Sequence, residues 1–181
     1  MNIKVNPQIE LKPLEMGDST SIFTILDQQR DYIGKWLPFV QYTHKIEDTR
    51  KFVASMIEEA EKNTTKVYSI LLGCELIGLI SFKDISKVNK STEIGYWISQ
   101  DHQGRGIMTD AVRQMCKMAF EEWKMNRIVI KCAEENYPSK RIPQKIGFKY
   151  EGLERESIVM IDGQFANLEV FSLLKSDGIV I

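Results

Sequence analysis

The middle of the chain alternates between strand and helix periodicity in an order that few folds accommodate. A helix with apolar residues at helical spacing is predicted from Gly106 to about Trp123, between two stretches of strand character. A strand–helix–strand crossover joins parallel strands, whereas short turns join antiparallel ones. One mixed sheet is therefore predicted from the strands of this region, which are Val67–Leu72, Leu76–Lys83, Ser91–Ile98 and Arg127–Cys132.

Both ends of the chain add elements of the same kinds. Toward the N-terminus we predict a strand at Ile9–Pro13 and then a helix capped by Asp18 or Ser19. A loop or short helix at Tyr32–Val40 follows, and then a longer amphipathic helix at Glu47–Lys62. Toward the C-terminus we predict a short helix at Ser139–Ile146 ending at Gly147, then a hairpin turning at Asp162-Gly163. No repeat or linker interrupts the chain, so residues 1–181 are predicted to form a single α/β domain.

Composition narrows the class of protein. The 181 residues are 43% hydrophobic, with a net charge of -1 and a pI of about 6.2, so direct nucleic-acid binding is not expected. Three scattered cysteines and two distant histidines form no metal-ligand spacing, and none is expected to hold a metal or a structural disulfide: Cys74, Cys116, Cys132, His44 and His102. No signal-peptide or membrane-spanning run is present, so a soluble cytoplasmic protein is expected.

A polar loop with two glycines, Gln103-Gly-Arg-Gly-Ile-Met-Thr109, separates the strand Ser91–Ile98 from the following helix. A helix N-terminus offers unpaired N–H groups and the positive end of the helix dipole to an anion. The glycines let the main chain approach a phosphate, while Arg105 adds a positive charge and Thr109 a hydroxyl. The loop matches neither GxxxxGK[ST] nor GxGxxG, and a tight turn that binds nothing is the alternative.

The same loop resembles the Gln/Arg-x-x-Gly-x-Gly/Ala pyrophosphate signature of the GNAT acetyltransferase superfamily. Further segments are similar to the RimJ/RimL branch, which contains the ribosomal-protein N-terminal acetyltransferases: Trp36–Pro38, Glu93–Ile98, Met108–Ala111, Asn136–Ser139, Lys145–Phe148, Glu151-Gly152, Asp162-Gly163 and Phe171–Leu174. Two positions depart from the pattern. Met108 replaces the small residue of the signature, and Pro143 stands where many members carry a tyrosine proposed to protonate the leaving thiolate.

The resemblance implies a mixed, largely antiparallel twisted sheet with helices on both faces, and acetyl-CoA as the co-substrate without a metal. It implies cofactor contacts from Ile98, Gln103, Gly104, Arg105, Gly106, Ile107, Met108, Thr109, Asn136 and Ser139. The implied reaction is direct attack of an amine on the acetyl thioester. The expected acceptor is the N-terminal α-amino group of a protein, a ribosomal protein in particular, and a homo-oligomer is left open.

Two side chains are candidates for the chemistry. Glu93, on the strand that enters the loop, is the candidate base, acting directly or through water, because an α-amino group with a pKa of about 7.7–8.0 needs only modest help. Ser139 matches the serine of the branch and is the candidate partner of the departing thiolate. Backbone N–H groups near Ile98 would stabilise the oxyanion. The alternatives are a polar residue at a strand start for Glu93 and a helix cap for Ser139 or Asn136.

Trp36, Tyr96 and Trp97 are predicted to line the acceptor pocket, although aromatic residues more often belong to a core. The acidic run of Glu151, Glu154 and Glu156 either attracts a basic peptide or is solvated surface. A polyamine, an aminoglycoside or an amino acid is the alternative acceptor. The alternative to an enzyme is a regulator that binds CoA and catalyses no reaction.

Overall fold

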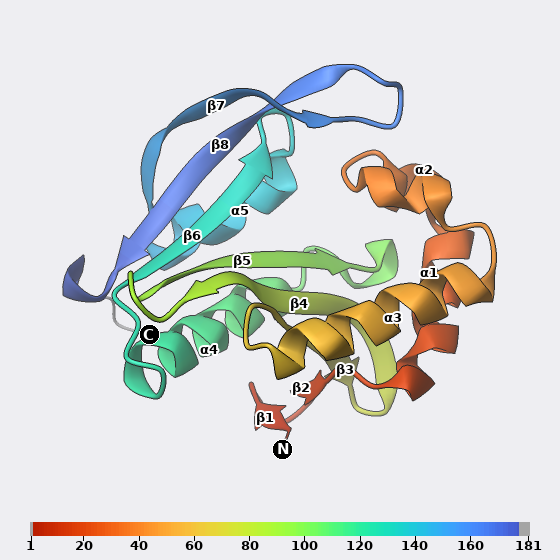
Figure 1. The fold of residues 1–181 in the computed structure, drawn as a ribbon, viewed down its shortest axis with the longest axis horizontal. Helices are drawn as coiled ribbons and strands as arrows, with labels where there is room; N and C mark the ends of the chain where they lie inside the picture. Colours follow the sequence, from red (N-terminus) through yellow and green to blue (C-terminus); the bar gives the residue numbers. More distant parts are fainter. Residues whose placement is uncertain (1, 178–181) are drawn as a thin grey trace.

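The computed structural model describes residues 2–177, in which eight strands form one sheet (Figure 1). The strand order is β1-β2-β3-β4-β5-β6-β8-β7. The strands are β1 Ile3–Lys4, β2 Ile9–Pro13, β3 Lys66–Leu72, β4 Glu75–Ser86, β5 Ser91–Ile98, β6 Arg127–Ala133, β7 Lys149–Val159 and β8 Phe165–Leu174. All predicted strands are confirmed, and the two-residue β1 is an addition too short for a periodic pattern to reveal.

One parallel pair interrupts an otherwise antiparallel sheet. β5 and β6, which are joined through a helix, run parallel and pair at only three positions, from Ser91↔Arg127 to Glu93↔Val129. β5 then continues to Ile98 and β6 to Ala133 without further pairing between them, and Figure 1 shows the two strands diverging. The mixed, largely antiparallel sheet expected from the sequence is confirmed, but its two halves separate in the middle.

Helices cover both faces of the sheet, as predicted. They are α1 Ser19–Gln28, α2 Arg30–Gly34, α3 Ile46–Glu61, α4 Ile107–Glu121 and α5 Tyr137–Ile146, with 3-10 turns η1 Met16–Asp18, η2 Pro38–Tyr42, η3 Gln100–His102 and η4 Lys175–Asp177. α1 and α3 bury Ile22 and Val53 in one hydrophobic cluster against the sheet. α4 buries Met115 in a second, larger cluster against the opposite face, which Ile146 of α5 also joins. Alternate residues of the central strands point into one cluster or the other, because side chains in a strand alternate between its faces.

The start of α1 differs from the cap that the sequence suggested. Asp18 occupies the N-cap position, but its carboxylate makes no cap hydrogen bond to the helix. It accepts hydrogen bonds instead from Lys12 Nζ at 2.6 Å and from Ser69 Oγ at 2.8 Å, and only 6% of the residue is exposed. The buried carboxylate therefore joins β2, β3 and the start of α1 through charge-assisted hydrogen bonds.

Candidate active site

The glycine loop has the geometry of an anion-binding helix start. Gly104 and Gly106 have positive φ angles of 72° and 79°, which side chains other than glycine rarely adopt. A Cβ atom at either position would meet no heavy atom within 4 Å, so the main chain there is open to an approaching group. No side chain caps α4 at Gly106, and the first intrahelical bond runs from Asp110 N–H to Gly106 O at 3.0 Å. The amide groups of residues 104–109 donate no backbone hydrogen bond within the described chain and are thus open to an anion.

The predicted loop residues contribute in two ways. The side chains of Ile107, Met108 and Thr109 are buried beneath α4, with residue exposures of 6–8%, so these residues offer their backbone N–H groups. Arg105 is exposed and donates a hydrogen bond from Nη2 to the carbonyl oxygen of Asp101 at 2.9 Å. The loop and the helix start therefore supply backbone donors beside one positive charge, which fits a pyrophosphate.

Beyond Glu93, the edge of β5 that faces β6 pairs with no strand of the described chain. Ser99 N–H donates to Ile77 O of β4 at 2.8 Å, so the backbone groups of the preceding residue, Ile98, point the opposite way. The same alternation directs the backbone groups of Tyr96 toward the diverging β6. The end of β5 thus presents backbone donors and acceptors where the sequence predicted an oxyanion site.

Three side chains from different elements meet where β5 and β6 part. Ser139 of α5 donates from Oγ to the Tyr96 hydroxyl at 3.3 Å, and that hydroxyl donates to the Ser139 carbonyl oxygen at 3.1 Å. Cys132 Sγ of β6 lies 3.2 Å from Ser139 Oγ. Burial raises the pKa of the Tyr96 phenol well above its usual value, and the pKa of the Cys132 thiol is also raised. Both groups therefore stay protonated and keep their hydrogens available near Ser139.

Asn136 and Ser139 have separate roles at the start of α5. Asn136 is the N-cap, and its Oδ1 accepts a hydrogen bond from Ser139 N at 3.2 Å. Of the two residues considered as a helix cap, Asn136 is therefore the one whose side chain caps α5. The Ser139 hydroxyl makes no cap bond and points to the junction with Tyr96 and Cys132. Pro143 of the same helix carries no titratable group, so it supplies no proton donor.

Glu93 lies at the last position of β5 that pairs with β6, immediately before these two strands diverge. Its carboxylate is half-buried and forms an ion pair with Lys83 Nζ at 2.9 Å. Lys131 Nζ of β6 lies 3.9 Å from the same carboxylate. The base predicted from the sequence is thus placed beside the opening, within a small network of charges.

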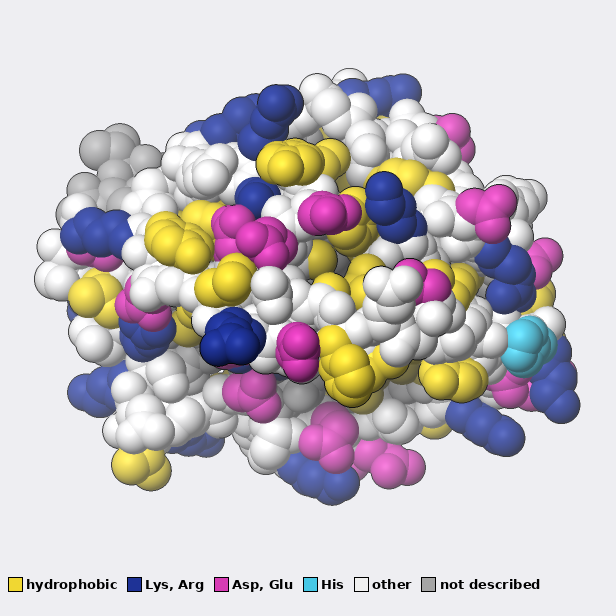
Figure 2. Space-filling model, turned by 90° about the horizontal axis from the view of Figure 1, so that it is seen from above, with side chains coloured by type: hydrophobic (Ala, Val, Ile, Leu, Met, Phe, Trp, Pro, Cys, Tyr) yellow, Lys and Arg dark blue, Asp and Glu magenta, His cyan; other side chains and the backbone are white. Residues whose placement is uncertain are grey.

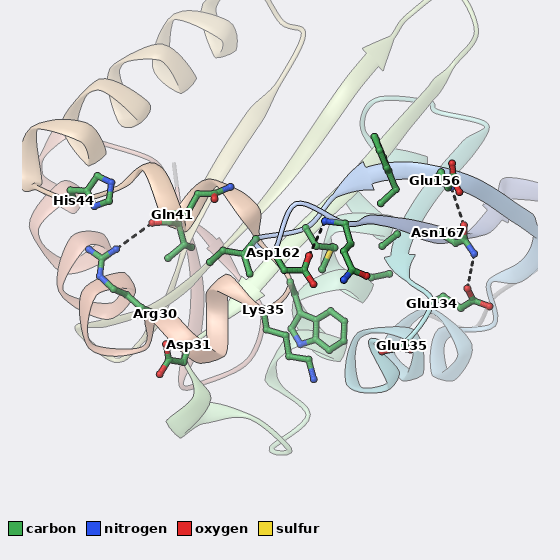
Figure 3. Close-up of a pocket in the computed structure, with 18 of the residues that line it drawn as sticks. Arg30, Asp31, Lys35, Gln41, His44, Glu134, Glu135, Glu156, Asp162 and Asn167 are labelled. Carbon is green, nitrogen blue, oxygen red and sulfur yellow. Dashed lines mark hydrogen bonds between the residues drawn. The ribbon is translucent and has the colours of Figure 1, made fainter.

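A groove of about 1200 Å³ runs from α1, α2 and η2 across the end of β6 to the β7–β8 hairpin. Figure 3 shows side chains from both walls around it, with Asn167 joining Glu156 and Glu134. Six carboxylates and two basic side chains line it: Asp27, Asp31, Glu134, Glu135, Glu156 and Asp162, with Arg30 and Lys35. Figure 2 looks onto this side of the molecule, where acidic, basic and hydrophobic side chains are interspersed.

Ion pairs reduce the acidity of the groove only at one end. Arg30 neutralises Asp27, with Nη2 and Oδ1 2.9 Å apart, and also donates to the Val40 and Thr43 carbonyl oxygens. Lys35 lies over the ring of Trp36 at 4.7 Å rather than against a carboxylate. Most of the lining carboxylates are therefore available to a cationic group, which a groove with this excess of negative charge attracts.

Two residues singled out in the sequence lie in this groove. Trp36 and Glu156, the last residue of the acidic run, both line the groove, whereas Glu151 pairs with Arg127 and Glu154 with Lys131. The remaining acidic residues are scattered between positions 27 and 162, and no local pattern connects them. The fold brings them together from both ends of the chain.

Tyr96 and Trp97 do not share a pocket with Trp36 in the described structure. Consecutive residues of a strand point to opposite faces, and here Tyr96 packs against the α4 cluster whereas Trp97 packs against the α1–α3 cluster. Tyr96 contacts Ser139, as described above. The set of three aromatic residues is therefore divided between the groove, the contact with Ser139 and the core.

Comparison with known proteins agrees with this geometry. The acetyltransferase (GNAT) domain model matches residues 8–149. The chain is 33% identical over 176 residues to YdaF of Bacillus subtilis, provisionally named a ribosomal N-acetyltransferase, covering 96% of this chain and 95% of that one. It is 30% identical to the ribosomal-protein-serine acetyltransferase of Escherichia coli, covering 88% and 89% of the two chains.

Among solved structures, RimL, a ribosomal L7/L12 α-N-protein acetyltransferase bound to coenzyme A through a CoA–cysteine disulfide, superposes with a TM-score of 0.92 at 25% identity, covering 96% and 98% of the two chains. The fold, the parted strands and the glycine loop define a transferase that uses acetyl-CoA. The chain belongs to the GNAT acetyltransferase family, and it is an acetyl-CoA-dependent N-acetyltransferase.

Two further features of the described residues bear on the site. No group of three or more His, Cys, Asp or Glu side chains within residues 2–177 is placed to hold a metal ion. None of the helices in that range is long and apolar enough to cross a membrane.

Proposed function

We propose that the acceptor is the N-terminal α-amino group of a protein, and that ribosomal proteins are the native targets. The observation that carries the proposal is the acidic groove, because a peptide N-terminus is a cation before it reacts. Ala133 of β6 lines the groove and directly follows Cys132, which lies 3.2 Å from Ser139 Oγ, so an amine bound at this part of the groove would lie near the opening between β5 and β6. The named relatives that acetylate ribosomal proteins support the choice of target. The reaction would then take place in the cytoplasm.

The proposed chemistry assigns each step to a group already in position. Acetyl-CoA supplies the activated acetyl group, with its pyrophosphate at the start of α4. Backbone N–H groups at the end of β5, near Ile98, stabilise the negative charge that develops on the carbonyl oxygen. Ser139 donates a hydrogen bond to the departing sulfur, while Tyr96 holds the serine in place and remains protonated. Asn136 orients α5 so that Ser139 faces the opening.

Glu93 is the proposed base and takes the amine proton through water. Replacing it by glutamine keeps the shape and removes the charge, so we expect a fall in kcat of about 100-fold or more near pH 7. An α-amino group is about 10% neutral at pH 7 and about 90% neutral at pH 9. The defect of Glu93→Gln should therefore shrink toward pH 9. A similar loss of kcat in Glu156→Gln, with Glu93→Gln active, would move the base to the groove.

The acceptor is tested by free-thiol release from acetyl-CoA with peptides beginning Ser, Ala or Met, followed by mass analysis of the product. Peptide-dependent release with the added acetyl group on the N-terminal residue is expected. The same peptides with a blocked N-terminus and an internal lysine are the control. Turnover with spermidine, aminoglycosides or amino acids alone would refute the peptide acceptor and leave the N-acetyltransferase in place.

Removing acidic charges from the wall of the groove tests whether the groove receives the acceptor. We expect Asp31→Asn and Glu135→Gln together to raise KM for the peptide about tenfold and to leave KM for acetyl-CoA unchanged, because both residues line the groove and not the glycine loop. Glu47→Gln together with Glu58→Gln on α3 is the matched control, since this pair removes the same two charges elsewhere on the surface. Equal KM values in all variants would show that the acidic groove does not receive the acceptor.

A further inference from the structure

A second pocket lies at the opposite end of α4 from the glycine loop. It has a volume of about 420 Å³ and is lined by residues of three loops and two strand ends: Asn63, Lys66, Ile85, Lys87, Lys90, Trp123, Lys124 and Met125. The 15 residues of α4 separate it from Gly106 by about 22 Å, given a rise of about 1.5 Å per residue. The pocket therefore belongs neither to the glycine loop nor to the acidic groove.

The charge of this pocket has one sign. Four lysines line it, and none of the described residues that line it is acidic. Lys124 Nζ donates to the Glu121 carbonyl oxygen at 2.5 Å and so offsets the negative end of α4. Lys66, Lys87 and Lys90 make no ion pair with any carboxylate in residues 2–177. Like charges gathered around one cavity favour a bound anion.

The pocket also has a fixed apolar wall. Trp123 packs on Phe82 of β4 with ring centroids 4.5 Å apart, and Ile85 lines the pocket beside it. The ammonium group of Lys66 lies 5.1 Å from the centre of the Trp123 ring, so the aromatic ring holds this charge at the pocket. A ligand that carries an apolar or flat group next to its negative charges would contact both features.

Backbone hydrogen bonds join the three walls. Asn126 N–H and Arg127 N–H both donate to the Lys90 carbonyl oxygen, at 2.6 and 3.1 Å, and Ile85 N–H donates to Thr64 O at 3.1 Å. Three lining residues, Asn63, Lys90 and Lys124, have positive φ angles of 58°, 50° and 56°. Two of them are lysines, for which this conformation is unfavourable. The surrounding hydrogen bonds therefore fix the main chain at Ile85 and Lys90 on two sides of the cavity.

We propose that this pocket binds an organic phosphate with at least two negative charges, of which a nucleotide is the simplest example. The phosphates would contact Lys66, Lys87 and Lys90, and the organic part would lie against Trp123 and Ile85. Because α4 separates the two sites, the ligand binds together with CoA and takes no part in acetyl transfer. The pocket is a separate ligand site on the acetyltransferase.

The test is calorimetric titration of ATP into the protein saturated with CoA, at 0.15 M salt. One saturable site is expected, with inorganic triphosphate bound at least about threefold more weakly, since it has no apolar part. Lys87→Glu should weaken ATP binding at least about tenfold. Lys51→Glu, an equal change of net charge on α3, is the matched control and should stay within about twofold of the original protein.

Four results would overturn the proposal. They are no saturable binding, loss of ATP binding when CoA is saturating, equal weakening by Lys51→Glu and Lys87→Glu, and triphosphate that binds as tightly as ATP. Single-stranded RNA provides the last arm of the experiment. An affinity for RNA that exceeds that for ATP and rises with its length would replace the small ligand by a nucleic-acid partner. Lys90→Asn is a second variant for the ATP titration. Asparagine tolerates a positive φ, so this change removes the charge without changing the turn.

Discussion

Replacing Gly106 by aspartate places a carboxylate at the N-cap of α4, where the pyrophosphate of CoA is expected to bind. The protein has room for the side chain, because a Cβ atom there meets no heavy atom within 4 Å. Its φ angle of 79° makes any side chain costly, by about 1–2 kcal/mol, with asparagine and aspartate the most tolerated. Steric exclusion within the free protein is therefore not the expected cause of lost binding.

The electrostatic cost of Gly106→Asp for CoA binding follows from the distance between the new carboxylate and the pyrophosphate. Two like charges about 5 Å apart repel by about 0.8 kcal/mol in bulk water and about 3 kcal/mol at an effective dielectric constant of 20. The site is a surface loop, so the result lies between these limits, which correspond to about a 4-fold and a 250-fold rise in Kd. We expect a value near 30-fold for Gly106→Asp relative to Gly106→Asn, which has the same shape without the charge.

The assay is calorimetric titration of CoA into both variants, at 0.1 M and at 1 M salt. The ratio of the two Kd values should fall at high salt, since the screening length decreases from about 10 Å to about 3 Å. A thermal melt of each variant without ligand separates a loss of fold from a loss of affinity. Equal affinities for CoA in the aspartate and asparagine variants at both salt concentrations would refute the anion site at this helix start.

Three further predictions concern the junction, the strand pairing and acid stability. Ser139→Ala should lower kcat more than CoA affinity, as steady-state kinetics and titration would show, and an equal loss in both would make the serine structural. Gly78→Ala should destabilise the protein by about 1–3 kcal/mol in denaturant unfolding, because its Cβ would lie 2.3 Å from the Trp97 carbonyl oxygen; unchanged stability would contradict the β4–β5 packing. The hydrogen-bonded Arg127 lowers the pKa of Glu151 from 4.5 to about 2, so the stability from this pair is complete above pH 4.5 and is lost as the pH falls toward 2. Glu151→Gln should flatten urea-unfolding stability in that range, and an unchanged pH profile would refute the role of the pair.

The glycine loop and the strand before it were predictable because the signals are local. β5 has the predicted bounds, Ser91–Ile98, and α4 begins directly after Gly106. Two glycines, a polar loop and the first helical turn are enough to predict an open helix start without any knowledge of distant contacts, and its binding of an anion stays a prediction. The cap of α5 at Asn136 and its end at Gly147 are equally local signals.

Long-range features of the site were not predictable. The separation of β5 from β6 after Glu93 depends on how two strands 30 residues apart are oriented, and no residue of either strand signals it. The carboxylates of the groove come from α1, α2, the end of β6 and the β7–β8 hairpin. The opposite orientations of Tyr96 and Trp97 could have been deduced from strand alternation alone, which excludes their shared pocket.

The unpaired edge at the end of β5 has a consequence for the free protein. A row of unsatisfied amide and carbonyl groups is the surface on which foreign strands add, and most proteins protect such edges. Here the edge lies within the sheet, between β5 and β6. In the proposed complex the pantetheine arm completes this hydrogen bonding, so acetyl-CoA takes the place of a missing strand. Amide protons at Tyr96 and Ile98 should then exchange with solvent slowly only when the co-substrate is bound, because part of the stability of the sheet comes from the ligand.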